Sequence, residues 1–442
     1  MSRLVGAEAI GYAAVAVSLA TLATSIAALN INVGGLRYVG EALGRGDLER
    51  ASSYFWSGLS YLAFTYAAAS AVLYLAPLGV SRELALATAA LVLSNVSIMA
   101  DVYIIAAYRA VVRFVGVFLG NAVRFAVGIL FAGWGWVGAV AGNIAASVTY
   151  ALLALSYSIR RLGIARPGFG GWLDMARAGV STWAPSAVVI IAQQSGVLAV
   201  FFSTGAVGSG HLFVAQGIVG VVGALAYVVF NMLTPTLAAM STGRRETATY
   251  AARIGLALTA PASVGLAVAP HVPLLLLGPD FADAATPLSL LALAVLPNVL
   301  NYTALSFLIA EGRFLHALYL SSVSSGVTLA LYVVLTPQWG AAGAAAAMLI
   351  ASIVTSLAAS LYLKPGGAHL KAIALPLAVG AAVYWMPWPL ALAAVGATYL
   401  LYPRAGVLTR RDVALLAEAI LGKKAHTIYR RYHTLINTIL PP

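Results

Sequence analysis

The chain has no cysteine and few charged residues. Only 9% of its 442 residues are charged, 25 basic and 13 acidic, whereas 62% are hydrophobic. Soluble domains carry about 25% charged residues, so this composition excludes a water-soluble globular protein. The absence of cysteine excludes a disulfide framework and a thiolate metal site. We expect no metal and no other cofactor.

Long apolar runs occupy most of the sequence. A helix needs about 20 apolar residues to cross a hydrocarbon core of about 30 Å. Runs such as 288–308 and 341–363 lack the alternation that strands of a membrane β-barrel require. The charged and Pro/Gly-rich breaks therefore predict an all-α polytopic membrane protein. Its thirteen predicted spans are 8–36, 52–78, 84–107, 114–132, 136–158, 178–203, 210–238, 250–276, 284–310, 315–336, 339–363, 369–386 and 387–402.

The basic residues gather on one side of this threading. With alternating sides, 22 of the 25 fall in one set of connections and in the tail, and only Arg3 and Arg82 lie opposite. Because short cytoplasmic loops hold Lys and Arg in excess, the crowded side is the cytoplasm. We therefore expect a multi-pass protein of the cell membrane with a cytoplasmic C-terminus. The net charge of +12 therefore reflects the basic residues of the cytoplasmic side, and we do not expect nucleic acid as a partner.

Two sequence stretches recur at nearly the same distance. WGWVGAVA at 134–141 returns as WGAAGAAA at 339–346, an offset of 205, and IAAYR at 105–109 returns as IAEGR at 309–313, an offset of 204. Two matches at equivalent span ends indicate an internal duplication. Both copies run in the same direction through the membrane, which predicts two like bundles related by an axis along the membrane normal.

The duplication predicts the organisation of the chain. We expect an N-terminal helix bundle of five spans over 1–165, a C-terminal bundle of six spans over 166–366, two additional spans over 367–402 and a basic cytoplasmic tail over 403–442. The first bundle is one span short, so either the fold tolerates this loss or a first span precedes Met1. The tail mixes basic and apolar residues, which suits either an interfacial helix on anionic headgroups or a solvated helix.

Arg124 lies in the middle of the predicted span 114–132. A guanidinium at this depth is costly unless it faces a wet cavity or a partner, so such residues usually mark substrate paths. Its planar fork suits phosphate oxygens, and Asn121 lies three residues earlier on the same helical face. The alternative is a structural ion pair between Arg124 and Asp101.

Asp101 shares a predicted helical face with Ser94, Ser97 and Tyr108. Three interpretations of this carboxylate stay open. It is a coupling site for H⁺ or Na⁺, the partner of Arg124, or a residue near the cytoplasmic end that reaches water.

Gln193, Asn231 and Asn301 add polar side chains to other spans. Each by itself suits an interhelical hydrogen bond, worth about 0.6 kcal/mol. Together with Arg124 and Asn121 they suggest a hydrated, substrate-binding space between the bundles. The sequence shows no paired carboxylates and no His/Asp/Glu cluster with the spacing of an enzyme site, which favours a transporter over an enzyme.

The stretch LLLLGPDFADAATPLSLLALAVLPNVLNYTALSFLIAEGR, residues 274–313, followed by the repeat at 339–345, resembles the oligosaccharide flippase (Wzx-type polysaccharide transporter) family of the MOP superfamily, which also holds the MATE exporters. The positions that match motifs of this family are Gly278, Phe281, Ala284, Ala310, Gly312, Arg313, Gly340, Gly343 and Ala344. The residues RLVGAE at 3–8 are similar to its connection after the first span. A second-half position that is often acidic in relatives corresponds to Gln193.

The resemblance implies a monomeric two-bundle transporter that alternates between inward-open and outward-open states. Its substrate would be a polyprenyl-phosphate- or pyrophosphate-linked oligosaccharide, flipped for polysaccharide or glycoprotein assembly, with membrane lipids as partners and H⁺ or Na⁺ as the coupling ion. A MATE-like cation-coupled multidrug antiporter is the first alternative, but it needs an anionic cavity. A membrane-embedded glycosyltransferase or polymerase is the second, and the short outer connections disfavour it.

Overall fold

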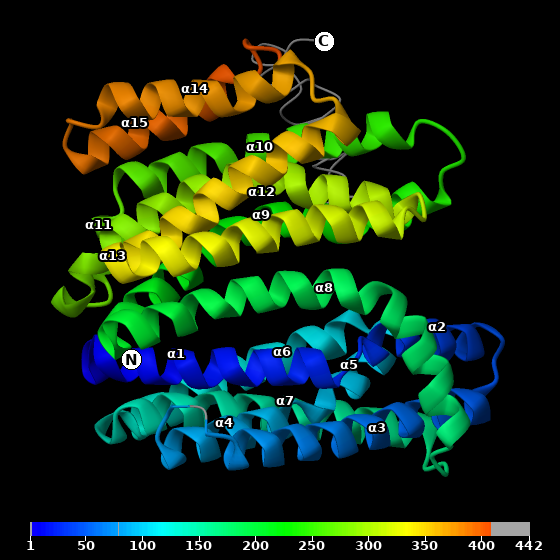
Figure 1. Cartoon of the computed structure of the whole chain (residues 1–442). Coiled ribbons are helices and arrows are strands. Elements are labelled where there is room, and N and C mark those ends of the chain that lie inside the picture. Colours follow the sequence, from blue (N-terminus) through cyan, green and yellow to red (C-terminus); the bar gives the residue numbers. More distant parts are fainter. Residues whose placement is uncertain (1, 78, 408–442) are drawn as a thin grey trace. The chain divides into compact units, whose positions relative to one another are not determined.

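The computed structural model describes residues 2–77 and 79–407, and every regular element in them is a helix (Figure 1). The elements are α1 (Ser2–Ala27), α2 (Ile31–Gly44), α3 (Leu48–Leu75), α4 (Arg82–Ser94), η1 (Asn95–Ser97), α5 (Ile98–Ala106), α6 (Ala110–Leu130), η2 (Ala132–Trp134), α7 (Trp136–Leu162), α8 (Phe169–Thr204), α9 (Ala206–Ala239), α10 (Arg244–Val268), α11 (His271–Leu275), η3 (Pro279–Ala284), α12 (Ala285–Ala310), α13 (Phe314–Leu363), α14 (Gly367–Val383) and α15 (Trp388–Leu401).

These helices confirm the predicted all-α polytopic class. Among the described residues, ten helices are long and apolar enough to cross a membrane. One of them, α13, has 50 residues and a non-helical backbone at Gly340, so it holds two of the predicted spans. The shorter apolar helices α14 and α15 account for the last two. Dividing α13 and adding these two gives thirteen segments, and the chain is a multi-pass membrane protein.

Three predicted spans are interrupted. The first, 8–36, is two helices, because Leu29 and Asn30 take left-handed backbone angles (φ 46° and 54°) between α1 and α2. The third, 84–107, is broken by the 3₁₀ turn η1. The span 250–276 contains the end of α10 at Val268 and the short helix α11 from His271. Hydropathy alone does not register the breaks at Asn30 and η1, since the apolar character of the sequence continues through both.

Contacts divide the chain into two compact units. The first runs to Phe213 and includes Tyr332–Gly340, and the second comprises Val214–Leu331 and the chain from Ala341 onward. The helix α8, which the duplication places at the start of the second bundle, packs on α1, α2 and α3 in the first unit. The predicted boundary at 165/166 divides the two copies of the internal duplication, and it stays a prediction. The tail predicted to be basic and cytoplasmic lies outside the described residues from position 408.

In the first unit, α1 is the central helix, with α3, α4, α7 and α8 against it (Figure 1). The helix α6 lies at the periphery, where its main neighbour is α7. Glycines on these two helices allow a close approach. A Cβ at Gly120 would lie 3.1 Å from the carbonyl oxygen of Ala146, and one at Gly142 would lie 2.8 Å from that of Arg124. Small residues therefore set the spacing of the two helices, as is common in membranes.

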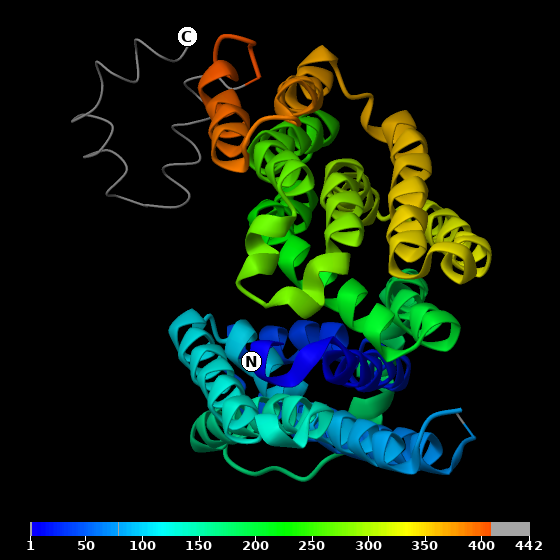
Figure 2. The same ribbon diagram turned by 90° about the vertical axis from the view of Figure 1, so that its left-hand side faces the viewer.

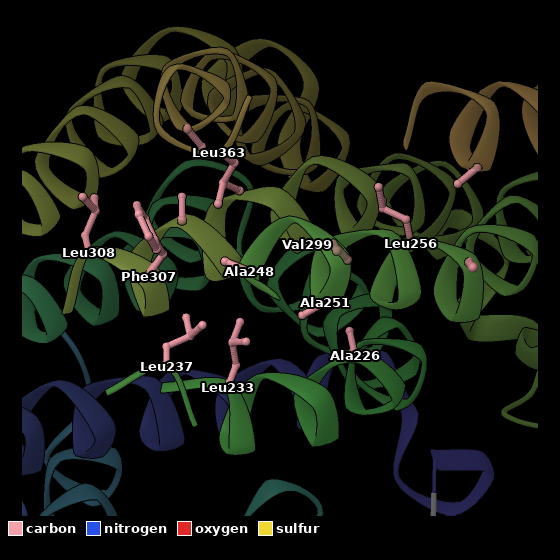
Figure 3. Packing of buried hydrophobic residues seen from close by; sticks show 14 of the residues in the cluster. Ala226, Leu233, Leu237, Ala248, Ala251, Leu256, Val299, Phe307, Leu308 and Leu363 are labelled. Atoms are coloured by element: carbon pink, nitrogen blue, oxygen red, sulfur yellow. The ribbon is translucent and has the colours of Figure 1, made fainter. Parts of the chain in front are cut away.

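In the second unit, α10 packs against α12, α14 and α15, and the hairpin of α14 and α15 lies beside it in both views (Figures 1 and 2). A cluster of buried hydrophobic residues joins α10, α12 and α14 to α9 and α13 (Figure 3). It includes Leu237, Leu256, Val299, Phe307 and Leu308, all at most 4% exposed. A second cluster, which includes Val264, Leu296 and Val395, packs the next part of α10 and α12 against α15.

The backbone repeats at the WG motifs. Gly135 has φ 59° and ψ −127°, and Gly340, 205 residues later, has φ 54° and ψ −130°. L-residues with a Cβ avoid this region, so each position requires glycine. The same break between two spans thus occurs twice, and the duplication inferred from the sequence extends to the backbone.

The second repeated motif forms the same helix-ending turn in both copies. Tyr108 and Gly312 have φ of 53° and 73°. The amide of Arg109 donates to the carbonyl of Ile104 at 2.9 Å, and the amide of Arg313 donates to that of Leu308 at 2.9 Å. This is the left-handed C-terminal cap that turns one helix sharply into the next. Each copy therefore builds an antiparallel hairpin, α5–α6 in the first and α12–α13 in the second.

Two similar segments contact each other within the first unit, where α1 meets the start of α9. A Cβ on Gly11 would fall on the backbone carbonyl of Ala206, and one on Gly210 would fall on that of Ala7. The two Ala-x-x-x-Gly segments are 199 residues apart and contact each other reciprocally. This is a crossing of two small-x-x-x-small motifs, in which helix backbones touch because neither side has a bulky side chain.

Candidate functional site

The polar site of the first unit begins at the break between α4 and α5. Here the side chain of Asn95 donates to the carbonyl of Leu91 at 2.7 Å, and the hydroxyl of Ser94 donates to the same carbonyl at 2.8 Å. Side chains that bond to the local backbone compete with helical hydrogen bonding, and a 3₁₀ segment inside a helix often marks a functional position. Both η1 and α5 contact α7, and α5 also contacts α6.

Asp101 of α5 is held by two side chains from the neighbouring helices. Arg113 of α6 donates from Nε to Oδ1 at 2.8 Å and from its terminal nitrogen to Oδ2 at 3.2 Å, a two-point ion pair. The phenol of Tyr150 in α7 donates to Oδ1 at 2.5 Å. The side chain of Asp101 is 21% exposed and that of Arg113 is 52% exposed. The cluster thus ties α5, α6 and α7 together beside the hairpin turn.

A cavity of about 280 Å³ opens beside this cluster. It is lined by Asn95, Ser97, Ile98, Asp101, Val117, Gly120, Asn121, Ala146, Ser147 and Tyr150. Two of the predicted site residues, Asp101 and Asn121, therefore meet at one cavity. Its polar groups are one carboxylate, two amides, two serine hydroxyls and one phenol.

Arg124 lies next to the cavity, one turn of α6 beyond Asn121, and its side chain is exposed. It has no hydrogen bond or ion pair to any described residue. Asn121 is also exposed, and its amide donates to the carbonyl of Val117 at 3.0 Å. Arg124 is thus a cation within an apolar span, with its backbone packed on Gly142 and its side chain available to a ligand.

The structure does not pair Arg124 with Asp101. The carboxylate pairs with Arg113 instead, because the turn at 107–109 folds α6 back along α5. In this hairpin, Asp101 and Arg113 are each six residues from Ala107 and so lie opposite each other. Arg124 is 11 residues farther along α6, about 16 Å at 1.5 Å per residue. The proposed structural ion pair with Arg124 is therefore wrong.

The predicted polar face around Asp101 is only partly present. Ser97 and Asp101 both line the cavity, whereas Tyr108 lies in the hairpin turn with 94% of its surface exposed. The helix ends at Ala106, so the helical spacing does not extend to Tyr108.

The other predicted site residues do not join this cavity. Gln193 of α8 is exposed and has no hydrogen bond among the described residues. Asn301 of α12, in the second unit, donates to the carbonyl of Ser352 at 3.1 Å and so bridges α12 and α13. The side chain of Asn231 lies outside the described part of the structure, although its backbone belongs to α9.

Arg113 and Tyr150 are the site residues that the sequence analysis missed. In the sequence, Arg113 is only one of the basic residues in the predicted connections between spans on the cytoplasmic side. In the structure α6 begins at Ala110 and includes this residue. A signal was present in the spacing. At 100° per residue, Arg113 and Arg124 differ by only about 20° around the helix, and Asn121 lies about 60° from Arg124. Tyr150 gave no comparable signal, since a lone tyrosine in a span is common.

A metal centre finds no support in the described residues, which contain no group of three or more His, Asp or Glu side chains arranged to hold an ion. Asp101 is paired with a guanidinium rather than with further carboxylates. The amides, hydroxyls and carboxylate that line the cavity are groups that donate or accept hydrogen bonds.

Comparison with known proteins identifies the fold. No family model matches the chain, and no curated protein matches its sequence. Solved structures do match. The lipid II flippase MurJ, in an inward-closed conformation, is similar with a TM-score of 0.65 and 15% identity, over 89% of this chain and 96% of that one.

Two further structures give the same result. An inward-facing multidrug resistance MATE family transporter of the MOP superfamily matches with a TM-score of 0.61 and 15% identity, over 85% of this chain and 92% of that one. A MOP superfamily transporter from Pyrococcus furiosus, described as having a binding pocket of reverse polarity that suggests a different function, matches with a TM-score of 0.56 and 16% identity, over 81% and 90%. The chain therefore has the fold of MOP superfamily transporters.

Proposed function

We propose that this protein flips a polyprenyl-phosphate- or pyrophosphate-linked oligosaccharide from the cytoplasmic to the outer leaflet of the cell membrane by alternating access. The product would serve polysaccharide or glycoprotein assembly, as in the Wzx-type family that the sequence resembles. The protein acts as a monomeric transporter rather than an enzyme, with its C-terminus in the cytoplasm. The fold shared with a lipid II flippase is consistent with this function.

The observation that carries the proposal is Arg124. A guanidinium in the middle of an apolar span, without a protein partner among the described residues, is costly unless it binds an anion or faces water. Its planar fork suits the oxygens of a phosphate. A lipid-linked sugar brings a phosphate to this depth as it crosses, because its polyprenyl tail stays in the bilayer.

A flippase needs such a site for a physical reason. Moving an ionised phosphate and several hydroxyls through hydrocarbon without partners costs many kcal/mol. A cation and a polar cavity replace the lost water. Arg124 supplies the cation, and the cavity at Asp101 and Asn121 supplies hydrogen bonds.

A MATE-like antiporter of organic cations is the alternative. It needs an anionic site, and the carboxylate in this cavity, Asp101, is already neutralised by Arg113. The proposed site therefore carries a net positive charge, which comes from Arg124. Coupling to H⁺ or Na⁺ stays a prediction, and Asp101 is its candidate residue.

The test is a flipping assay in proteoliposomes with a fluorescent polyprenyl-pyrophosphate-linked oligosaccharide. Replacing Arg124 with Ala removes the phosphate ligand, so we expect the initial rate to fall at least 100-fold, as for the loss of one charge-assisted contact of about 3 kcal/mol. Arg124→Lys keeps the charge but not the fork, and should retain partial activity.

The matched control is Arg82→Ala, which removes an arginine from the first turn of α4, away from the cavity. This variant should flip at the wild-type rate, and all variants should reach the membrane in equal amounts. Full activity of Arg124→Ala would exclude the phosphate role of this residue.

A further inference from the structure

The cavity at Asp101 has the chemistry of a sugar subsite. Its lining offers the carboxylate of Asp101, the amides of Asn95 and Asn121, and the hydroxyls of Ser97, Ser147 and Tyr150. These groups both donate and accept hydrogen bonds, as the hydroxyls of a sugar do. Its volume of about 280 Å³ is at the lower end of small-molecule pockets, which run from about 300 to 1,000 Å³. That size suits one sugar ring.

The charge of the cluster favours a neutral ligand over a cation. The two-point bond from Arg113 balances the charge of Asp101. A cation placed on the carboxylate would lie close to the guanidinium and be repelled by it. A sugar hydroxyl meets no such repulsion, because it needs only an oxygen that accepts a hydrogen bond.

Asp101 keeps an accepting position for such a hydroxyl. A carboxylate has about four acceptor positions. Arg113 and Tyr150 each donate a hydrogen bond to Oδ1, and Arg113 donates a second one to Oδ2, so three of these positions are occupied. The phenol oxygen of Tyr150 also keeps its acceptor capacity, since its O–H only donates a hydrogen bond to Asp101. The three side chains thus hold the acceptors in fixed positions before the ligand arrives, which lowers the entropic cost of binding.

The cavity is adjacent to the proposed phosphate position. Asn121 lines it, and Arg124 follows about 4.5 Å farther along α6. Arg113 marks the other end, toward the side predicted to be cytoplasmic. A lipid-linked sugar entering from the cytoplasmic leaflet has its tail deepest, then its phosphate, then its first sugar. The order of Arg124, the cavity and Arg113 along α6 matches this order.

We propose that the cavity between η1, α5, α6 and α7 binds the sugar residue next to the phosphate of the lipid carrier, with Asp101 and Tyr150 as acceptors for its hydroxyls and Arg113 as the residue that positions Asp101. This inference rests on the proposed function and assigns it a specificity site. The cavity distinguishes a glycosylated carrier from the bare carrier, whereas Arg124 binds the phosphate common to both.

The experiment compares two lipids on the purified protein in nanodiscs, polyprenyl phosphate and polyprenyl-phosphoryl-hexose, with binding followed by native mass spectrometry. We expect the wild type to bind the hexose-bearing lipid about tenfold more tightly. Tyr150→Phe and Ser147→Ala each remove one hydroxyl and should lower this preference about threefold to tenfold. Both variants should leave the affinity for polyprenyl phosphate unchanged.

Tyr157→Phe and Ser158→Ala are matched controls on the same helix, because neither residue lines the cavity. They should keep the full preference for the hexose-bearing lipid. Arg124→Ala should weaken both lipids equally and preserve the preference between them. If Arg124→Ala binds both lipids as tightly as the wild type does, the phosphate role is contradicted. If Arg124→Ala weakens both lipids but the wild type does not prefer the hexose-bearing lipid, the sugar subsite alone is contradicted.

Three results overturn the sugar subsite. The first is equal binding of both lipids by the wild type, and the second is a preference that survives Tyr150→Phe and Ser147→Ala. The third is a cation in place of a sugar, seen if Na⁺ alone stabilises the wild type against heat but not Asp101→Asn. If Asp101→Asn does not fold, the two hydroxyl variants still decide the question, since each removes a single oxygen atom.

Discussion

The two repeats share their backbone and differ in their charges. The breaks at Gly135 and Gly340 have nearly the same angles, and the turns at Tyr108 and Gly312 both have a positive φ. At the same offset of 204 residues, however, Asp101 corresponds to Leu305, Arg113 to Ala317 and Asn95 to Val299.

The ion pair of the first repeat therefore has no counterpart in the second, although uncharged polar residues remain there, since Ser97 corresponds to Asn301 and Ser147 to Ser352. Val299 and Ala317 are buried in the cluster of Figure 3, and Leu305 packs against it. Tyr150 corresponds, at the offset of 205, to Thr355, whose hydroxyl donates to its own helix at the carbonyl of Ala351. The repeated residues build the scaffold, and the residues that differ make the site.

The largest expected effect comes from breaking the reciprocal contact of the two Ala-x-x-x-Gly segments in α1 and α9. Gly11→Leu and Gly210→Leu each place a side chain on a backbone carbonyl of the facing helix. We expect each to destabilise the protein by about 3 kcal/mol or more, because neither backbone can retreat without separating the helices. Thermal unfolding in detergent measures this loss.

The control for this pair is Gly217→Leu, also on α9, where a Cβ meets nothing within 4 Å. It should change the unfolding temperature little. A large difference between Gly11→Leu and Gly210→Leu would contradict the equivalence of the two segments.

The second prediction concerns the WG breaks. Gly135→Ala and Gly340→Ala force a Cβ into backbone angles that L-residues avoid, so each should cost about 1–3 kcal/mol. Gly340→Ala should cost slightly more, because its Cβ would also lie 3.3 Å from Thr204, whereas that of Gly135 meets only Ala9 at 3.9 Å. Thermal unfolding of both variants in one detergent checks the order. An unaffected variant would show that its break does not require glycine.

The smallest expected effect lies in the hairpin turns. Tyr108 holds a left-handed conformation with its side chain 94% exposed, where the second repeat has Gly312. Tyr108→Gly relieves this strain without removing a packed side chain and should stabilise the protein by about 0.5 kcal/mol. Gly312→Ala should destabilise it by about 1 kcal/mol. Chemical denaturation of the two variants checks the opposite signs.

The sequence predicted the spans because length and hydropathy determine them. It also predicted the split within α13, since Gly340 lies in a repeated motif. The breaks at Asn30 and η1 were not predictable from hydropathy, because they depend on local backbone angles and on hydrogen bonds from side chains such as Asn95 to the backbone.

The candidate site was predictable only in part. Asp101 and Asn121 were chosen separately as polar residues in spans, and the fold brings them to one cavity. The partner of Asp101 depends on the hairpin turn at 107–109, which places Arg113 opposite it. Predicting this pair requires the exact ends of α5 and α6, and the sequence defines helix ends less well than helix centres.

The most direct test of the proposed function compares two substrates on wild-type protein in proteoliposomes. One is a fluorescent polyprenyl-pyrophosphate-linked oligosaccharide, and the other is a fluorescent organic cation driven by an imposed H⁺ or Na⁺ gradient. A flippase with Arg124 as its phosphate ligand moves the lipid-linked sugar between leaflets and leaves the organic cation where it is. Transport of the cation without movement of the lipid would contradict the proposal and assign the protein to the antiporters.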